Sequence, residues 1–265
     1  MISKFALAFA SLLAGSVVSG HMHVRSPCVR RSPDDACDVP LDDKDYDIMS
    51  PISTFGRSDP MPLCRGSPKG AAKSTFKAGD TVMMQFDNNA IHKGGHCEFS
   101  ISLDDKTFVA LKTIVLECFI DSNGLNIPIT IPETAPTLKD ATLAWTWVNA
   151  EGNREFYMNC MDVDIEGVEG GQIVGPEIVI ANYGADESVY PKIGQFYHGD
   201  SPRTELYENR PMITLGGDGA AAPTSTPTST DDADDEPTPS ATNDPSAPQP
   251  TATSIPGKKC KPRRH

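Results

Sequence analysis

A histidine follows directly after the segment that is predicted to be the leader peptide of the chain. Residues 1–20 combine Lys4 with an apolar run and end on small residues, a pattern typical of a secretory signal peptide. Cleavage after residue 20 leaves His21 first, where its α-amine and one ring nitrogen can chelate a metal together. A second histidine would complete the three-nitrogen set that copper(II) prefers. The sequence therefore predicts a copper site that begins at His21, with one copper ion per domain.

Two candidates for the second histidine lie in the segment HKGGHC at residues 92–97. Its two glycines allow the backbone to approach other groups closely, and a strand is predicted to follow. His92 and His96 both remain open as ligands on this pattern, and an ordinary loop histidine is the alternative for each. His23 leaves a further choice, because HMH at the mature start either binds copper locally or places His23 at the edge of the site.

The elements that would position these residues are predicted to be short β-strands. Runs of β-branched and aromatic residues alternate with turn-forming pairs such as Asn123-Gly124. We expect strands at residues 80–86, 97–103, 108–116, 126–131, 143–148, 157–165 and 177–180. No long amphipathic helix is predicted, and residues 21–77 are expected to be a long irregular region. The fold predicted is all-β, an immunoglobulin/fibronectin-III-like antiparallel β-sandwich with long disulfide-stapled loops.

Six of the seven cysteines fall within this predicted sandwich. A secreted chain enters an oxidising environment, so disulfides are expected. Six cysteines allow fifteen connectivities, and the sequence alone does not choose among them. No CxxC pair is present, which argues against a cysteine-ligated metal. The six are Cys28, Cys37, Cys64, Cys97, Cys118 and Cys160, whereas Cys260 lies apart, near the C-terminus.

Changes in composition divide the chain into four predicted parts. The signal peptide at 1–20 precedes a β-sandwich domain at 21–215. A Pro/Thr/Ser-rich acidic linker, predicted to be disordered, follows at 216–257, with a short basic tail at 258–265. The tail either contacts an acidic wall polymer or is simply solvated. The net charge of −13 argues against nucleic acid and anionic lipid as partners and leaves a neutral polysaccharide or a small molecule.

Four further strings of residues carry a resemblance to a known family. They are HKGGHCEFSISLDDKTF at 92–108, AWTWVNAEGNREFYMNC at 144–160, GPEIVIAN at 175–182 and VYPKIG at 189–194. Together with the mature start His21-Met22, they resemble the lytic polysaccharide monooxygenases, specifically the fungal chitin-active group called auxiliary activity family eleven. The resemblance covers most of the chain from residue 21 to residue 194, and GNREFYMNC is its most specific part.

The resemblance implies roles for individual residues. His21 matches the N-terminal member of the family's histidine brace, and His92 matches the second member. His96 stands where the family usually has a small residue, so it is the weaker candidate. Tyr157 matches the axial tyrosine near copper. Glu155 shares a strand face with Tyr157 by the two-residue period and matches the outer-sphere carboxylate.

The activity implied is oxidative cleavage of a polysaccharide, chitin in this group, with oxidation at C1. It requires copper, an external electron donor, and hydrogen peroxide or dioxygen as co-substrate. We expect a secreted monomer, extracellular or associated with the cell wall, with no nucleic-acid or membrane partner. One alternative is a copper-binding protein for metal acquisition or wall association without polysaccharide cleavage. Another is a non-catalytic carbohydrate-binding or wall-structural module.

Four residues near the end of the predicted domain leave a choice between substrate contact and packing. Phe196, Tyr197, His198 and Tyr207 lie within residues 191–211. Their rings either extend a surface that stacks on sugars or pack against the sandwich.

Overall fold

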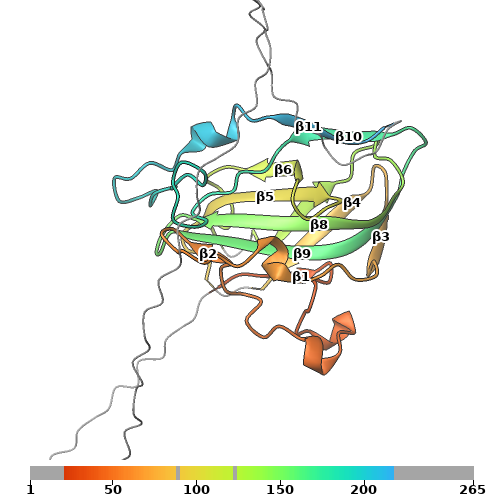
Figure 1. Cartoon of the computed structure of the whole chain (residues 1–265), viewed down its shortest axis with the longest axis horizontal. Helices are drawn as coiled ribbons and strands as arrows, with labels where there is room; N and C mark the ends of the chain where they lie inside the picture. The colour runs from red at the N-terminus through yellow and green to blue at the C-terminus, as the bar shows by residue number, and fades with distance from the viewer. Residues whose placement is uncertain (1–20, 88–89, 122–123, 218–265) are drawn as a thin grey trace, which may run out of the picture. The chain divides into compact units, whose positions relative to one another are not determined.

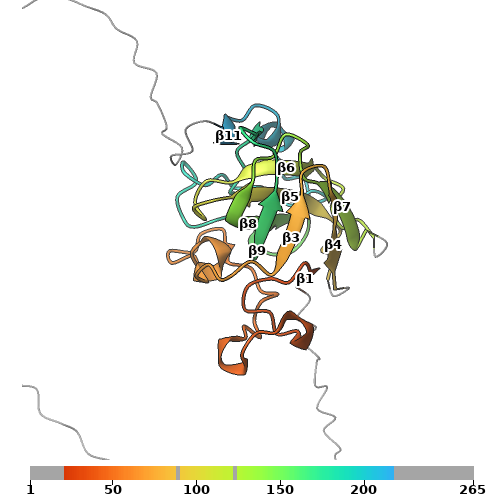
Figure 2. The same cartoon turned by 90° about the vertical axis from the view of Figure 1, so that its right-hand side faces the viewer.

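The computed structural model describes residues 21–87, 90–121 and 124–217, so the predicted signal peptide, basic tail, Cys260 and nearly all of the predicted linker lie outside the described residues. Two sheets form the body, and Figure 2 shows them as separate layers. The smaller sheet has the order β1 (Val24–Ser26), β4 (Thr81–Phe86) and β7 (Asn126–Thr130). The larger sheet has the order β2 (Ser53–Thr54), β9 (Glu155–Glu166), β8 (Leu138–Asn149), β5 (Gly95–Ser102) and β6 (Val109–Ile114), with β3 (Ser74–Lys77) parallel to β9.

The core between the two sheets follows from strict alternation of side chains along β4. Val82, Met84 and Phe86 are buried, whereas the residues between them are exposed. The Phe86 ring makes edge contacts with Phe119 and Trp145, at centroid distances of 4.8 and 5.0 Å. The predicted β-sandwich is therefore confirmed, with an aromatic cluster at its centre.

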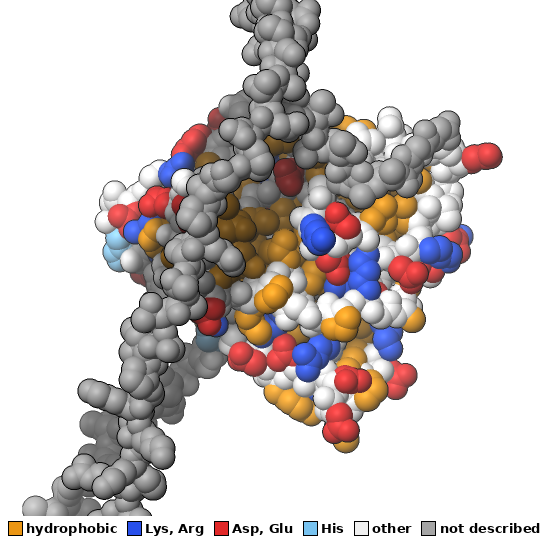
Figure 3. Space-filling model, in the orientation of Figure 1, with side chains coloured by type: hydrophobic (Ala, Val, Ile, Leu, Met, Phe, Trp, Pro, Cys, Tyr) orange, Lys and Arg blue, Asp and Glu red, His pale blue; other side chains and the backbone are white. Residues whose placement is uncertain are grey.

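The large sheet is buried on both faces along its central strands. All eight residues of β5 are buried, so this strand has no face turned to solvent. Its polar side chains, those of His96, Glu98, Ser100 and Ser102, are buried too. The face turned away from the small sheet is the one seen in Figure 1, where the segment after β9 lies over part of it. Apolar side chains gather toward the middle of this face in Figure 3. A second hydrophobic cluster, separate from the core between the sheets, has partly buried side chains packed against it. They are Met61, Leu63, Val179, Ile180, Tyr190, Phe196, Leu206 and Tyr207.

The strand predicted at residues 177–180 is wrong. The strand in this region is β10 (Gln172–Pro176), which pairs with β11 (Met212–Gly216). Beyond β10 the backbone leaves the ladder, because the Val179 N–H donates to the Glu98 carboxylate at 2.6 Å instead of to a strand. The apolar run is buried, as its composition indicates, but it packs on the large sheet without continuing a ladder of its own.

The N-terminal region is more ordered than predicted. The short strands β1, β2 and β3 fall within residues 21–77, where the sequence predicts a long irregular region. Helical turns in the described residues are all 3₁₀ turns of at most four residues, and no described helix is long and apolar enough to cross a membrane. They are η1 (Asp35–Cys37), η2 (Leu41–Asp43), η3 (Leu63–Gly66) and η4 (Thr204–Tyr207). The predicted disulfides form as Cys28–Cys37, Cys64–Cys160 and Cys97–Cys118.

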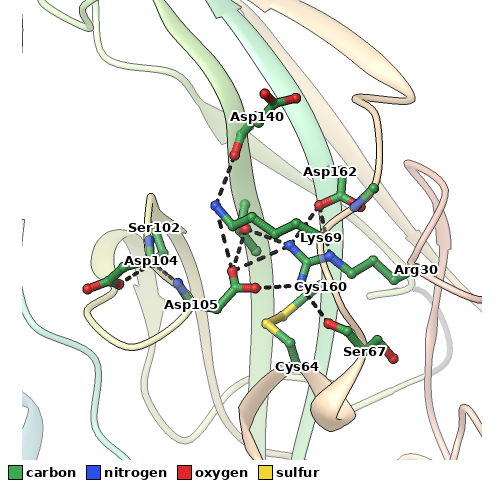
Figure 4. Close-up of polar contacts among 12 residues, drawn as sticks. Arg30, Cys64, Ser67, Lys69, Ser102, Asp104, Asp105, Asp140, Cys160 and Asp162 are labelled. Carbon is green, nitrogen blue, oxygen red and sulfur yellow. Dashed lines mark hydrogen bonds and ion pairs between the residues drawn. A yellow bond between two sulfur atoms is a disulfide. The ribbon is translucent and has the colours of Figure 1, made fainter.

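A buried arginine fastens the N-terminal region to the large sheet. The Arg30 guanidinium contacts Asp105 and Asp162, each at an N–O distance of 2.7 Å, and donates to the Thr142 hydroxyl at 2.7 Å (Figure 4). Because the guanidinium is almost fully buried, this pairing is costly to break. It anchors the segment that follows His21 along the chain.

Candidate metal centre

His21 is positioned by the residues that follow it. Met22 is fully buried, and the Val24 N–H donates to the Asn159 side chain at 2.9 Å. The segment that begins at His21 is therefore held against β9, and His21 itself remains partly exposed. Its ring centroid lies 6.1 Å from that of Tyr157, at the beginning of β9.

His92 stands on a tight turn with an unusual backbone. The Gly94 N–H donates to the Ile91 carbonyl at 2.8 Å, and both His92 and Lys93 have left-handed φ angles, of 43° and 55°. The Glu151 N–H donates to the His92 carbonyl at 3.0 Å, which ties this turn to the end of β8. Non-glycine residues adopt such φ values seldom, and when they do they often mark functional sites.

Gly95 and Trp147 connect this turn to the rest of the site. A Cβ atom on Gly95 would collide with the Val148 carbonyl and the Trp147 indole nitrogen, so the predicted need for close backbone approach is confirmed there. The Trp147 ring lies 5.6 Å from the His92 ring and 4.7 Å from the Tyr157 ring. The rings of His21, Tyr157, Trp147 and His92 therefore form one cluster, which we call the ring cluster.

A carboxylate lies beside this cluster. The Tyr157 hydroxyl donates to the Glu155 carboxylate at 2.8 Å, so the prediction that the two residues share a strand face is confirmed. The Asn149 amide donates to the same carboxylate oxygen at 3.1 Å, which compensates for the burial of Glu155. Burial, and then the neighbouring Glu155 carboxylate, raise the pKa of Tyr157 far above its ordinary value. Tyr157 is therefore a protonated phenol at any physiological pH.

His96 is excluded as a metal ligand by its contacts. Its side chain is buried, its Nε2 lies 2.8 Å from the Pro202 carbonyl, and its Nδ1 accepts from the Leu116 N–H at 3.0 Å. Its ring packs at 4.7 Å from those of both Phe196 and Tyr207. Burial lowers the pKa of His96 to about 4, so the ring is neutral and both nitrogens are occupied.

His23 lies in a different environment from His21. It is buried, and its Nε2 lies 3.5 Å from the Asp87 carboxylate. Burial lowers the pKa of His23, although Asp87 opposes the effect. This arrangement favours a structural role for His23 over local chelation by the first three residues.

The donor set of the ring cluster fits copper. Among the described residues, no group of three or more His, Cys, Asp or Glu side chains converges on a common point. The cluster offers two imidazoles and a phenol, and cleavage after residue 20 would add the α-amine of His21. Three nitrogens with an oxygen nearby suit copper(II), whereas calcium or magnesium would need several carboxylates.

Three residues of the site carry no distinctive signal in the sequence. Trp147 is indistinguishable from Trp145 as an aromatic core residue, and both are fully buried. Asn149 and Asn153 direct their amides at Glu155, the latter at 3.5 Å. Asn149 precedes the predicted turn Glu151-Gly152-Asn153 and Asn153 ends it, and both lie in the string at residues 144–160 that carries the family resemblance, which are the hints that could have pointed to them.

Comparison with known proteins assigns the chain to a class. No family model matches it. It is 33% identical over 190 residues to AA11 family lytic polysaccharide monooxygenase A of Aspergillus fumigatus, covering 69% of this chain and 83% of that protein. An AA11 family lytic polysaccharide monooxygenase of Aspergillus oryzae is 32% identical over 183 residues, covering 63% of this chain and 40% of that protein. These relatives share the class of polysaccharide-oxidising monooxygenases. The chain belongs to the AA11 family of lytic polysaccharide monooxygenases.

Solved structures show weaker likenesses. A cellulose-active polysaccharide monooxygenase from M. thermophila matches with a TM-score of 0.38 and 15% identity, over 56% of this chain and 73% of that one. A chitin binding domain from Burkholderia pseudomallei matches with a TM-score of 0.37 and 12% identity, over 55% of this chain and 98% of that one. At these scores the likenesses assign neither a metal nor a substrate.

Proposed function

We propose that this protein is a secreted, copper-dependent monooxygenase that cleaves chitin oxidatively at C1. The observation that carries the proposal is the ring cluster, in which the His21 ring lies next to that of Tyr157 and the His92 ring next to that of Trp147. Membership of the AA11 family supports oxidative cleavage of a polysaccharide. Chitin and C1 oxidation rest on the resemblance of the sequence strings to the chitin-active group.

In this proposal the metal is held by His21 and His92, the two histidines of the ring cluster. The α-amine and one ring nitrogen of His21, together with one ring nitrogen of His92, would hold a single copper ion, with the Tyr157 phenol beside them. Bound copper supplies one-electron redox chemistry, with electrons from an external donor and hydrogen peroxide or dioxygen as co-substrate.

Glu155 and Tyr157 hold a proton next to the metal. The Tyr157 O–H donates to Glu155, and the raised pKa of Tyr157 keeps this proton on the phenol. Asn149 donates to the same carboxylate oxygen, which fixes the orientation of Glu155. The Glu155 carboxylate is therefore an oriented hydrogen-bond acceptor for a co-substrate or a substrate hydroxyl.

The His92 turn contributes rigidity. Its backbone is fixed by the hydrogen bonds to Ile91 and Glu151, and Gly95 brings it close to the Trp147 ring. Ligands held in one geometry before the metal arrives reduce the cost of binding it. The buried Trp147 ring also excludes water from beneath the site.

The experiment that tests the proposal is product analysis on insoluble chitin and on cellulose. Protein whose first residue is His21 is loaded with copper and incubated with ascorbate and hydrogen peroxide, and soluble products are identified by mass spectrometry. We expect C1-oxidised chitooligosaccharides from the wild type and none from His92→Ala. His265→Ala is the matched control, because it removes a histidine outside the predicted domain.

Each outcome decides between the proposal and its alternatives. Oxidised products from chitin that depend on His92 support it. Tight copper binding without oxidised products from either polymer favours a metal-acquisition protein. Products that persist in His92→Ala contradict the histidine pair as the copper site, and oxidised products from cellulose alone contradict chitin as substrate.

A further inference from the structure

Residues 194–201 form a compact loop next to the ring cluster. The loop closes on itself where the Gly194 N–H donates to the Ser201 carbonyl at 3.0 Å. It is tied to the end of β8, because the Phe196 N–H donates to the Ala150 carbonyl at 3.0 Å. The blue-green chain on the left of Figure 1 includes this loop, at the same end of the molecule as β2.

The loop touches the turn that carries His92 and also the neighbouring turn between β8 and β9. The Tyr197 hydroxyl donates to the Lys93 carbonyl at 3.2 Å. The Gln195 side chain accepts from the Gly152 N–H at 3.4 Å, and a Cβ atom on Gly152 would lie only 3.2 Å from the His92 Nδ1. The loop is therefore continuous with the surface around His92.

The aromatic residues of this region divide into two groups. Phe196 and Tyr207 pack on the buried His96, each at 4.7 Å, so they belong to the folded interior. Tyr197 is 58% exposed, and the Phe196 ring supports it at a centroid distance of 6.4 Å. Tyr197 therefore presents a large aromatic surface to solvent although its hydroxyl is fixed.

A group of polar side chains lies in the same region. The Glu151 Oε1 contacts the Lys93 ammonium at 2.9 Å and the His198 Nε2 at 3.0 Å. All three groups are partly or largely exposed, so each can still exchange hydrogen bonds with a ligand. Ile120 lies against Gly94 of the His92 turn, and its side chain is exposed.

We propose that Tyr197, with the Lys93–Glu151–His198 group beside it, is a binding site for a sugar unit of chitin adjacent to the unit that lies at His92. A pyranose ring has an apolar C–H face, which suits an exposed phenol ring, and a polar edge, which suits neighbouring charged donors and acceptors. The N-acetyl amide of chitin provides both a donor and an acceptor for Glu151 and Lys93. The inference rests on the proposed function.

Binding to chitin tests this site independently of catalysis. Full-length protein beginning at His21 is mixed with increasing amounts of chitin, with and without copper, and the unbound fraction is measured. We expect Tyr197→Ala to weaken binding about three- to tenfold, as expected for loss of one aromatic contact. Tyr197→Phe should bind as the wild type does, because the ring remains.

The matched control is Tyr46→Ala. Tyr46 is 69% exposed and belongs to the N-terminal region rather than to the loop at residues 194–201, so its loss removes a similarly exposed phenol. We expect this variant to bind chitin like the wild type. The copper spectrum of Tyr197→Ala should also match that of the wild type, which shows that the metal site is intact.

The outcomes separate this inference from the proposed function. Wild-type binding by Tyr197→Ala, or equal weakening by Tyr46→Ala, overturns the Tyr197 site even when oxidised chitin is produced. A Tyr197-dependent loss of chitin binding in a protein that yields no oxidised product supports the site while the proposed function fails. A wild-type protein that does not bind chitin at all overturns the site as well.

Discussion

Two histidines four residues apart, His92 and His96, lie in opposite environments. His92 is partly exposed on a turn, and its ring lies beside that of Trp147, which in turn contacts Tyr157. His96 is buried beneath residues 196–207, and both of its ring nitrogens are hydrogen-bonded. His96 is structural because residues 196–207 cover it, whereas this segment leaves His92 available as a ligand. The spacing of the two histidines in the sequence does not reveal this difference.

The surroundings of the two histidines extend this contrast. Beneath residues 196–210, Glu98 is buried and pairs with Arg210 at 2.5 Å, and it also accepts from Thr113 and from the Val179 N–H. Around His92, the charged groups of Lys93 and Glu151 face solvent. The first region stabilises the fold through buried polar groups that pair with one another, whereas the second keeps polar groups available to a ligand.

Removing Arg210 should produce the largest loss of stability. Arg210→Ala leaves Glu98 buried without its cationic partner, and we expect the free energy of unfolding to fall by about 3–5 kcal/mol. Urea unfolding monitored by fluorescence measures this change. Arg203→Ala is the control, because its pair with Glu205 is exposed and should contribute less than about 1 kcal/mol. An equal loss of unfolding free energy in both variants would contradict the view that the buried region around Glu98 and Arg210 determines stability.

The pH dependence of stability should show that His96 is buried in its neutral form. Its pKa of about 4 in the folded protein lies below the ordinary histidine value of 6.5, so the unfolded chain binds more protons between these values. The His96 contribution is complete above pH 6.5 and is lost as the pH falls toward 4, by about 3 kcal/mol in total. Urea unfolding at pH 7 and pH 4.5 should show a steeper loss for the wild type than for His96→Gln. Identical pH dependence in the two proteins would show that His96 is not held neutral.

The hydrogen bond from Tyr157 to the Glu155 carboxylate should contribute more to stability than a hydrogen bond to a neutral acceptor does. We expect Tyr157→Phe to lower the free energy of unfolding by about 2 kcal/mol, because a buried carboxylate loses a donor. Tyr183→Phe is matched to it, since Tyr183 donates to the neutral Met61 carbonyl, and its loss should be about 1 kcal/mol. Thermal unfolding of copper-free protein compares the two. A larger effect at Tyr183 would mean that Glu155 does not depend on Tyr157.

His92 should matter least to the stability of the copper-free protein. Its ring is partly exposed on a turn, so His92→Ala should change the free energy of unfolding by less than about 1 kcal/mol. Chemical unfolding in the presence of a chelator measures this. A loss as large as that of Arg210→Ala would place His92 in the structural group and would remove the contrast with His96.

The sequence predicts the sandwich well where local pattern and tertiary structure agree. Residues 80–86 alternate apolar and polar side chains, and β4 buries the corresponding face. At residues 177–180 the same kind of apolar run is buried by packing and by the bond to Glu98, which no local pattern encodes. In the site, the contacts of His92 and Tyr157 with Trp147 arise only when β5, β8 and β9 pair.

The central claim is that His21, once it is the first residue, binds copper together with His92. Electron paramagnetic resonance during titration with copper(II) tests it most directly. The comparison is between protein beginning at His21 and protein with one additional residue before His21. We predict one copper ion per protein and an axial signal for the first form, and a lost or altered signal for the second. Identical spectra and affinities for the two forms would contradict an amino-terminal ligand, and the proposed monooxygenase mechanism would fail with it.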